Sequence, residues 1–250
     1  MNEHSPAPKH SFAQSARSTA VTHLGQVTTS KPRWTPSSLT TAALSLAAEQ
    51  FADKYRKGGD TPYLSHLLAV SALVMEHGGS EEQSAAGLLH DIIEDVGVSI
   101  NELVDLLVTR GAERVVAQRV ATMVQATTDG QPGDKRDPAD WRRRKHAYLQ
   151  GLTEKPMNEP ALLVSLADKV HNAEATLALV RGGISANDLY GGPEFDAKAP
   201  DQKWYYSALA AVFRGKLGET ETALPLVERL ERAIGTIFVD APNQPLVDGH

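Results

Sequence analysis

The segment Leu88–Asp95 combines four apolar side chains with four that can ionise, in the order Leu-Leu-His-Asp-Ile-Ile-Glu-Asp. Residues three and four positions apart share a helix face, so a helix would gather His90, Asp91, Glu94 and Asp95 on one side. The apolar residues would bury the other side. One imidazole and three carboxylates gather easily only when a cation compensates their charge. The segment therefore predicts a metal site, with a solvated acidic helix face as the alternative.

Two further residues suit the same metal. His66 and Asp168 each interrupt an apolar helical pattern that would otherwise be pure core. Imidazole and carboxylate ligands favour Mn, Fe, Zn, Co or Mg ions. The chain has no cysteine, which excludes a thiolate site. Taken singly, each residue also fits an ordinary buried side chain, a core histidine for His66 and the partner of a basic residue for Asp168.

The composition is that of an ordinary globular protein. The chain has 250 residues, of which 41% are hydrophobic and 22% charged, and its formal net charge is −6. Proteins that bind nucleic acid through their overall field are normally basic, so we expect no nucleic-acid partner. No apolar run reaches the length of a membrane-spanning helix, and the N-terminus lacks the apolar core of a secretory signal. With no cysteines, the chain suits a reducing cytoplasm, and we expect a cytoplasmic protein without membrane contact.

The elements that must position these residues are helices. Helical periodicity extends over residues 36–238 without a strong strand pattern, which predicts one all-α domain of about eight to ten helices. Residues 1–35 are rich in Ser, Thr, Pro and His and predict a disordered N-terminal extension, and residues 239–250 predict a short C-terminal tail. Order is expected to begin near Thr35, whose side chain can cap a helix.

Individual segments then follow from the pattern. His66 falls in a helix expected over residues 63–77, and one continuous helix from Ser80 is expected to carry the whole acidic segment. Asp168 falls in an apolar helix that starts at Pro160. Loops are expected at residues 127–138 and 184–200. The remaining predicted helices include a strongly basic one at 141–152, one that begins near Trp204 and an amphipathic one at 219–237.

Three blocks of sequence carry a resemblance to a known family. The first places Arg56-Lys57 ahead of Pro-Tyr-Leu-Ser-His at residues 62–66, the second is His90 to Asp95, and the third is Ala-Asp-Lys-Val-His-Asn-Ala at 167–173. His66, the His90-Asp91 pair and the distant Asp168 resemble the HD superfamily of metal-dependent phosphohydrolases. All three blocks in this order resemble the hydrolase domain of RelA/SpoT-type enzymes, and most of all the stand-alone small alarmone hydrolases, which include the metazoan SpoT homologue. The match covers roughly residues 38–215.

The resemblance implies a single HD-domain helical bundle that removes the 3′-pyrophosphate of guanosine tetra- or pentaphosphate, usually with Mn²⁺. By the same resemblance, Glu94 and Asp95 position and activate the attacking water. The residues implied as metal ligands are His66, His90, Asp91 and Asp168. The residues implied or favoured by charge as contacts to the nucleotide substrate are Arg56, Lys57, Asn172, Lys169, Arg144 and Lys145.

Two departures from the family pattern concern the nucleotide base. Gly58-Gly59 stands where Ser-Gly is usual, and Ala175 stands where a base-contacting Thr is expected. Both leave the metal residues intact, so an adenine alarmone or another phosphorylated nucleotide such as NADPH is an alternative substrate. A non-catalytic nucleotide-sensing helical domain is a third interpretation, and the complete set of metal and acid residues argues against it.

Overall fold

The structure is a computed structural model that describes residues 34–57, 59–128, 138–193 and 195–240. The predicted terminal segments, 1–35 and 239–250, lie almost entirely outside these ranges, as does Gly58. The predicted domain bounds, 36–238, stay a prediction. None of the described helices has both the length and the apolar character needed to span a bilayer.

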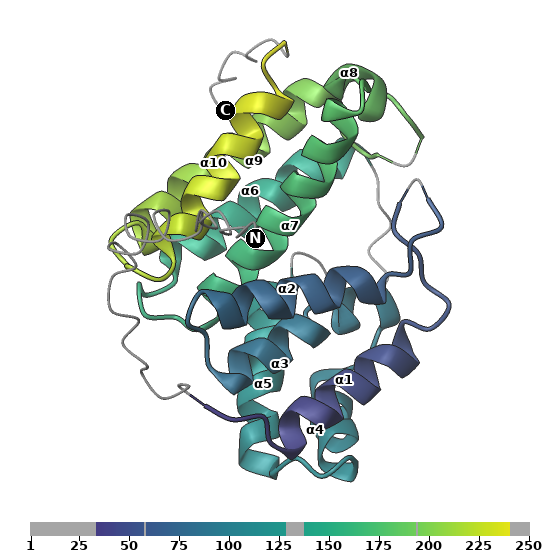
Figure 1. The fold of residues 1–250 in the computed structure, drawn as a ribbon, viewed down its shortest axis with the longest axis vertical. Helices are drawn as coiled ribbons and strands as arrows, with labels where there is room; N and C mark the ends of the chain where they lie inside the picture. Colours follow the sequence, from purple (N-terminus) through teal and green to yellow (C-terminus); the bar gives the residue numbers. More distant parts are fainter. Residues whose placement is uncertain (1–33, 58, 129–137, 194, 241–250) are drawn as a thin grey trace, which may run out of the picture. The chain divides into compact units, whose positions relative to one another are not determined.

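The described residues form ten α-helices and one π-helical turn (Figure 1). In chain order these are α1 (Ser38–Gln50), α2 (Leu64–Glu76), α3 (Glu81–Leu89), the π-turn η1 (Ile92–Val96), α4 (Ile100–Thr109), α5 (Arg114–Thr127), α6 (Pro138–Glu154), α7 (Ala161–Arg181), α8 (Ala186–Leu189), α9 (Ala199–Leu217) and α10 (Leu224–Ile237). The only β pairing in the described ranges is an isolated bridge between Tyr55 and Pro62. The predicted all-α class and helix number are confirmed.

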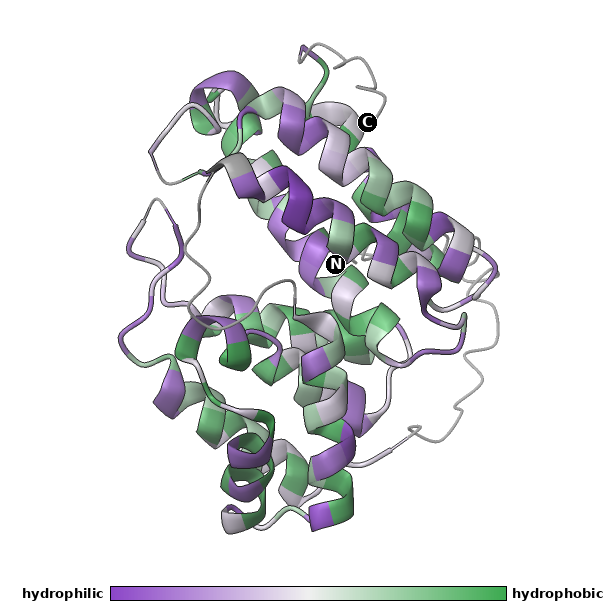
Figure 2. Ribbon diagram, turned by 180° about the vertical axis from the view of Figure 1, so that it is seen from behind, coloured by the Kyte–Doolittle hydropathy of each residue, from purple (hydrophilic) through white to green (hydrophobic). Residues whose placement is uncertain are grey.

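Helix α7 is the element on which the others converge. Helices α2, α3 and α5 pack against it, and so do α9 and α10 (Figure 1). Every residue from Ala161 to Asp168 is buried, because neighbours surround this half of the helix. Apolar residues concentrate on the faces where helices pack together (Figure 2). A polar group such as the Asp168 carboxylate is therefore held at a defined place inside a packed core.

Short polar side chains set the helix starts. Ser37 caps α1 by accepting a hydrogen bond from the Leu39 amide, so the predicted cap at Thr35 is two residues too early. Ser80 and Gln83 form a reciprocal capping box at α3, and Ser99 caps α4. These caps satisfy backbone amides that have no partner within the helix.

Several predicted bounds are wrong. The predicted loop at 184–200 contains α8, where the Ser185 hydroxyl caps the helix by accepting a hydrogen bond from the Asp188 amide. Helix α9 starts at Ala199 rather than near Trp204, since a proline in its first turn fits the helix there. Helix α10 starts at Leu224, after a turn that occupies the first residues of the predicted helix. The largest difference is that α3 ends at Leu89, inside the acidic segment.

Candidate active site

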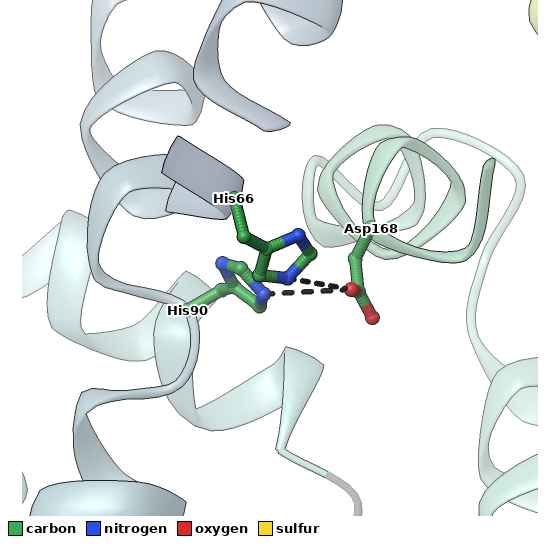
Figure 3. Close-up of side chains that lie close together, drawn as sticks. All are labelled: His66, His90 and Asp168. Atoms are coloured by element: carbon green, nitrogen blue, oxygen red, sulfur yellow. Dashed lines mark ion pairs between the residues drawn. The ribbon is translucent and has the colours of Figure 1, made fainter. Parts of the chain in front are cut away.

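The predicted metal residues converge from three elements. His66 lies in the first turn of α2, His90 directly follows α3, and Asp168 lies in the middle of α7. Their side chains point toward one another (Figure 3). Asp168 Oδ1 lies 3.2 Å from His66 Nε2 and 3.6 Å from His90 Nε2. One donor atom from each residue falls within 4.8 Å of the others, which is a suitable arrangement for binding one metal ion.

Asp91 joins the cluster because the helix breaks at this point. Adjacent residues of an α-helix point about 100° apart, yet Asp91 Oδ2 lies 2.9 Å from His90 Nε2 and 3.7 Å from His66 Nε2. The backbone of Asp91 leaves the helical region, with φ −97° and ψ 1°. The prediction of one continuous helix through Asp95 is therefore wrong, since an unbroken helix would direct the imidazole and the neighbouring carboxylate to different places.

The ring of His90 is oriented by the backbone. Its Nδ1 lies 2.8 Å from the carbonyl oxygen of Gly87, so this nitrogen donates and Nε2 is left to face the site. His90 Nε2 is buried and makes no well-aligned hydrogen bond within the described residues, although its ion-pair partner Asp91 Oδ2 lies 2.9 Å away. Buried nitrogen atoms without a well-aligned hydrogen bond are rare and call for an explanation. Together with the mixed nitrogen and oxygen donors, this atom fits a divalent metal ion.

Small residues on α3 bring the two histidines together. A Cβ atom on Gly87 would lie 3.2 Å from Ser71 Cα and 3.3 Å from Ser71 N, both in the backbone of α2. The side-chain oxygens of Ser71 and Ser84 share a buried hydrogen bond of 2.8 Å across the same contact. This close approach of α2 and α3 places His66 beside His90.

The positive charge of His90 and the negative charges of Asp91 and Asp168 stabilise one another. Burial lowers the pKa of His66. Burial also opposes charge on His90, but the nearby Asp91 and Asp168 outweigh it and hold the pKa of His90 well above its usual value. Burial likewise opposes ionisation of the two carboxylates. His90 nevertheless lowers the pKa of Asp91 to about 2, and Lys169 and the histidines hold the pKa of Asp168 well below its usual range. Two ionised carboxylates thus face the cluster at neutral pH, which favours a bound cation.

The acid pair Glu94 and Asp95 lies on the π-turn. Glu94 and Asp95 belong to η1, which is anchored by the buried Ile92 and Ile93 and ends at Gly97. Gly97 has φ +85°, a conformation that glycine adopts without strain. Both acids are half-buried and line the same cleft as Asp91. π-Helical turns are rare in proteins, and those that occur are frequently found at functional sites.

All but one of the predicted site residues line one cleft of about 840 Å³. The exception is His66, which lies behind the cleft surface in contact with Asp91 and Asp168. The predicted residues in the lining are Arg56, Lys57, His90, Asp91, Glu94, Asp95, Arg144, Lys145, Asp168, Lys169 and Asn172. A cleft of this size accommodates a small phosphorylated molecule.

The basic helix α6 turns one guanidinium inward. Arg143 is 74% exposed and pairs with Asp140, whereas the side chain of Arg144 is only 15% exposed and lines the cleft. Its Nη2 atom lies 4.0 Å from Asp196 Oδ2. The Nε and Nη2 atoms of Arg144 are buried without a hydrogen-bond partner in the described structure. A buried guanidinium group with N–H groups that make no hydrogen bond can bind an anion that enters the cleft.

Three residues that contact the site were not predicted. The Tyr63 hydroxyl donates to Asp91 Oδ2 over 2.6 Å. His171 Nδ1 lies 2.8 Å from His66 Nδ1, and Lys54 donates to the backbone carbonyl of Asp95. His171 is three residues after Asp168 on an inward helix face, a spacing that points to it. Nothing in the local sequence distinguishes Lys54 from a solvated lysine.

The chain is similar in sequence to known proteins. The model of the HD domain family matches residues 43–181, more than half of the chain. A Xenopus tropicalis protein named guanosine-3′,5′-bis(diphosphate) 3′-pyrophosphohydrolase MESH1 is 32% identical over 133 residues, which are 52% of this chain and 65% of that protein. A Synechocystis protein, named probable guanosine-3′,5′-bis(diphosphate) 3′-pyrophosphohydrolase, is 28% identical over 149 residues, which are 58% of this chain and 17% of that protein. The chain thus spans less than two thirds of the length of either relative.

Solved structures agree on the fold. The structure of a metazoan orthologue of SpoT that hydrolyses ppGpp matches with a TM-score of 0.57 and 22% identity, covering 80% of this chain and 97% of that one. At this identity the likeness concerns the helical arrangement alone.

Proposed function

Since this chain belongs to the HD domain family, we propose that it is a metal-dependent (p)ppGpp 3′-pyrophosphohydrolase. The observation that carries the proposal is the juxtaposition of two features in one cleft. The first is the buried cluster of His66, His90 and Asp168, with Asp91 beside it. The second is the set of cationic side chains around the same cleft. A substrate with several phosphate charges needs both.

The proposed reaction is a hydrolysis at the ribose 3′ position. The oxygen of a water molecule forms a bond to the phosphorus that carries the ribose 3′-oxygen, and the bond between that phosphorus and the 3′-oxygen breaks. The 3′-oxygen ends with a proton, and the water contributes the remaining hydroxyl to the released pyrophosphate. The products are GDP and pyrophosphate from ppGpp, or GTP and pyrophosphate from pppGpp.

We propose that the cluster holds Mn²⁺. The ligands would be His66, His90, Asp91 and Asp168, a mixed set of imidazole and carboxylate donors that suits this ion. A divalent ion polarises a phosphoryl oxygen and makes a nearby water more acidic. Asp91 is held toward the histidines by the Tyr63 hydroxyl, and His90 is held by the Gly87 carbonyl. Such supporting bonds fix the direction in which a ligand presents its lone pair.

The acid pair on η1 would handle the water. A carboxylate within hydrogen-bond reach of the attacking water can take its proton. Glu94 and Asp95 follow Asp91 closely in the sequence and line the same cleft. We assign proton transfer to Glu94, and to Asp95 the orientation of the water or of a metal ligand.

The cationic residues would bind the substrate phosphates. Arg144 offers buried Nε and Nη2 groups that make no hydrogen bond among the described residues. Lys57 and Lys145 line the same cleft, as does Lys169, which pairs with Asp168 over 2.7 Å. Arg56 reaches the cleft from the connection between α1 and α2. Cations around a phosphoryl group stabilise the charge that develops as the bond to the leaving group breaks.

Hydrolysis of ppGpp by the purified protein with Mn²⁺ tests the proposal. The expected products are GDP and pyrophosphate in equal amounts. Asp91→Ala should lose both metal and turnover, whereas Glu94→Ala should keep the metal and lose turnover. An absence of turnover by the wild-type protein, with bound metal demonstrated, would contradict the proposed function.

The identity of the base is a separate question, raised by Ala175. This residue lines the cleft, while the hydroxyl of the adjacent Thr176 lies 3.4 Å from the Tyr190 hydroxyl. A substrate panel of ppGpp, pppGpp, ppApp and NADPH distinguishes a guanine alarmone from the alternatives. Tight nucleotide binding without any turnover would instead favour a sensor.

A further inference from the structure

The connection between α1 and α2 contacts the segment Asp91–Asp95 at the first and at the last residue of that segment. At the first end, the Tyr63 hydroxyl donates to Asp91 Oδ2 over 2.6 Å. At the other end, Lys54 Nζ donates to the backbone carbonyl of Asp95 over 2.8 Å. The segment between these two contacts contains Glu94. One short connection therefore bonds to Asp91 in the proposed metal cluster and to the backbone of Asp95 in the acid pair.

The connection is held firmly enough to act as a support. The Lys54 amide donates to the Phe51 carbonyl over 3.1 Å, and the Tyr63 amide donates to the Lys54 carbonyl over 2.8 Å. The rings of Phe51 and Tyr63 stack with centroids 5.4 Å apart, and Phe51 is fully buried. Both backbone groups of Lys54 are thus bonded. Its side chain starts from a point that is fixed relative to Tyr63 and the core.

The contact is made where the π-turn needs support. The last carbonyls of a helical turn have no partner further along the helix. A cation near this end is favourable, because it meets the negative end of the helical dipole. The Lys54 ammonium group bonds to the carbonyl of Asp95, the next-to-last residue of η1. Loss of this bond would free the end of the turn and let the preceding side chain shift.

We propose that Lys54 is a positioning residue that holds the π-turn, and with it Glu94 and Asp95, in the geometry that the reaction requires. The proposal rests on the function proposed above. Lys54 also lines the cleft, so a direct contact with substrate phosphate is the competing role. The two roles differ in kinetics: a positioning residue affects kcat, whereas a phosphate contact that binds substrate and transition state alike affects KM.

Substitution of Lys54 by Met tests the proposal against a matched control. Lys216→Met removes a bond of the same kind, from an ammonium group to the Lys155 carbonyl over 2.5 Å, outside the cleft lining. For Lys54→Met we expect kcat to fall about 10- to 100-fold, as displacements of catalytic groups by about 1 Å do. The KM for ppGpp should change by less than about threefold and the affinity for Mn²⁺ should not change, since the cluster is intact.

Hydrogen exchange and two further variants of Lys54 extend the test. Amide hydrogen exchange at residues 92–98 of the metal-free protein should accelerate in Lys54→Met and not in Lys216→Met. Lys54→Arg keeps a donor and should recover part of kcat. Lys54→Gln is polar but too short to reach the carbonyl, so it should behave like Lys54→Met and replaces it if the Met variant does not fold.

A higher KM with unchanged kcat would overturn the proposal in favour of phosphate binding. Unchanged kcat together with unchanged exchange would also overturn it. If the wild-type protein itself shows no turnover, the proposed function fails, and the exchange comparison still decides whether Lys54 holds the turn.

Discussion

Asn172 donates a hydrogen bond from Nδ2 to Asp168 Oδ1 over 2.6 Å. Because its nitrogen faces the carboxylate, its Oδ1 faces away and accepts a hydrogen bond from Arg56 Nη1 over 3.0 Å. One amide thus links a proposed metal ligand to a proposed substrate-binding cation. The sequence resemblance implies a contact with the nucleotide for Asn172, and the structure adds a contact with Asp168.

The first prediction concerns this link. Asn172→Ala removes the hydrogen bond that orients Asp168, and we expect the affinity for Mn²⁺ to fall by about tenfold or more, as for other residues that support metal ligands. Isothermal titration of the metal-free protein with MnCl₂ measures this directly. Asn101→Ala, on an exposed position of α4, serves as the control. An unchanged metal affinity with a higher KM would mean that Asn172 acts on the nucleotide alone.

The second prediction concerns the contact between α2 and α3. In Gly87→Ala the new methyl group would lie 3.2 Å from the Ser71 backbone, so α2 and α3 must shift apart by a few tenths of an ångström. We expect a loss of stability of about 1–3 kcal/mol, typical of overpacking, together with weaker Mn²⁺ binding because His66 and His90 move apart. Thermal unfolding and metal titration measure the two effects.

Gly235→Ala on α10 is the matched control for this substitution. A Cβ atom at this position meets no atom within 4 Å. We expect a stability gain of about 0.5–1 kcal/mol from helix propensity. Equal behaviour of the two variants would show that Gly87 is not needed for close packing.

The third prediction separates two neighbouring arginines. Arg144→Met should raise the KM for ppGpp at least about tenfold, since a charge-assisted phosphate contact is worth about 1.5–3 kcal/mol. Its melting temperature should not fall, because the buried guanidinium makes no hydrogen bond through Nε or Nη2 in the described structure. Arg143→Met removes an exposed charge paired with Asp140 and should change neither quantity. Loss of folding in Arg144→Met with unchanged KM would assign Arg144 a structural role.

The fourth prediction concerns pH and the contact between α1 and α3. Glu81 Oε1 accepts hydrogen bonds from the Ser37 amide over 2.7 Å and from the Thr40 hydroxyl over 2.6 Å. Burial opposes ionisation of Glu81, but these bonds outweigh it and hold its pKa below 4.5. The ionised group therefore adds stability that is present above pH 4.5 and is lost as the pH falls through the lower folded-state pKa.

Glu81→Gln removes this contribution. At pH 7 we expect a stability loss of about 1 kcal/mol, the usual contribution of such a hydrogen bond. The difference from the wild type should shrink as the pH falls through the folded-state pKa of Glu81. Urea unfolding at a series of pH values measures it, with Glu219→Gln at an exposed position as the control. A difference that is constant with pH would exclude the ionised form as its cause.

The sequence alone determined the fold class and the family, and it predicted the residue types that form the cluster. Helical periodicity with internal histidines and carboxylates requires that those polar groups meet a partner, since isolated buried charges are unfavourable. The apolar residues of Leu88–Ile93 were predicted to be buried, and all four are. The HD family predicted from the motifs is confirmed by a match over residues 43–181. The roles of the individual site residues stay predictions.

Only the tertiary structure decided which atoms meet. The acidic segment has ideal helical spacing, so nothing local reveals that α3 ends at Leu89. The break allows His90 and Asp91 to face one point shared with α2 and α7. The inward arginine of α6 and the support by Lys54 depend on packing between elements far apart in the chain, as does the link from Arg56 to Asn172 across 116 positions. Local periodicity specifies a helix and its buried face, but contacts at such separations are set by how the helices pack.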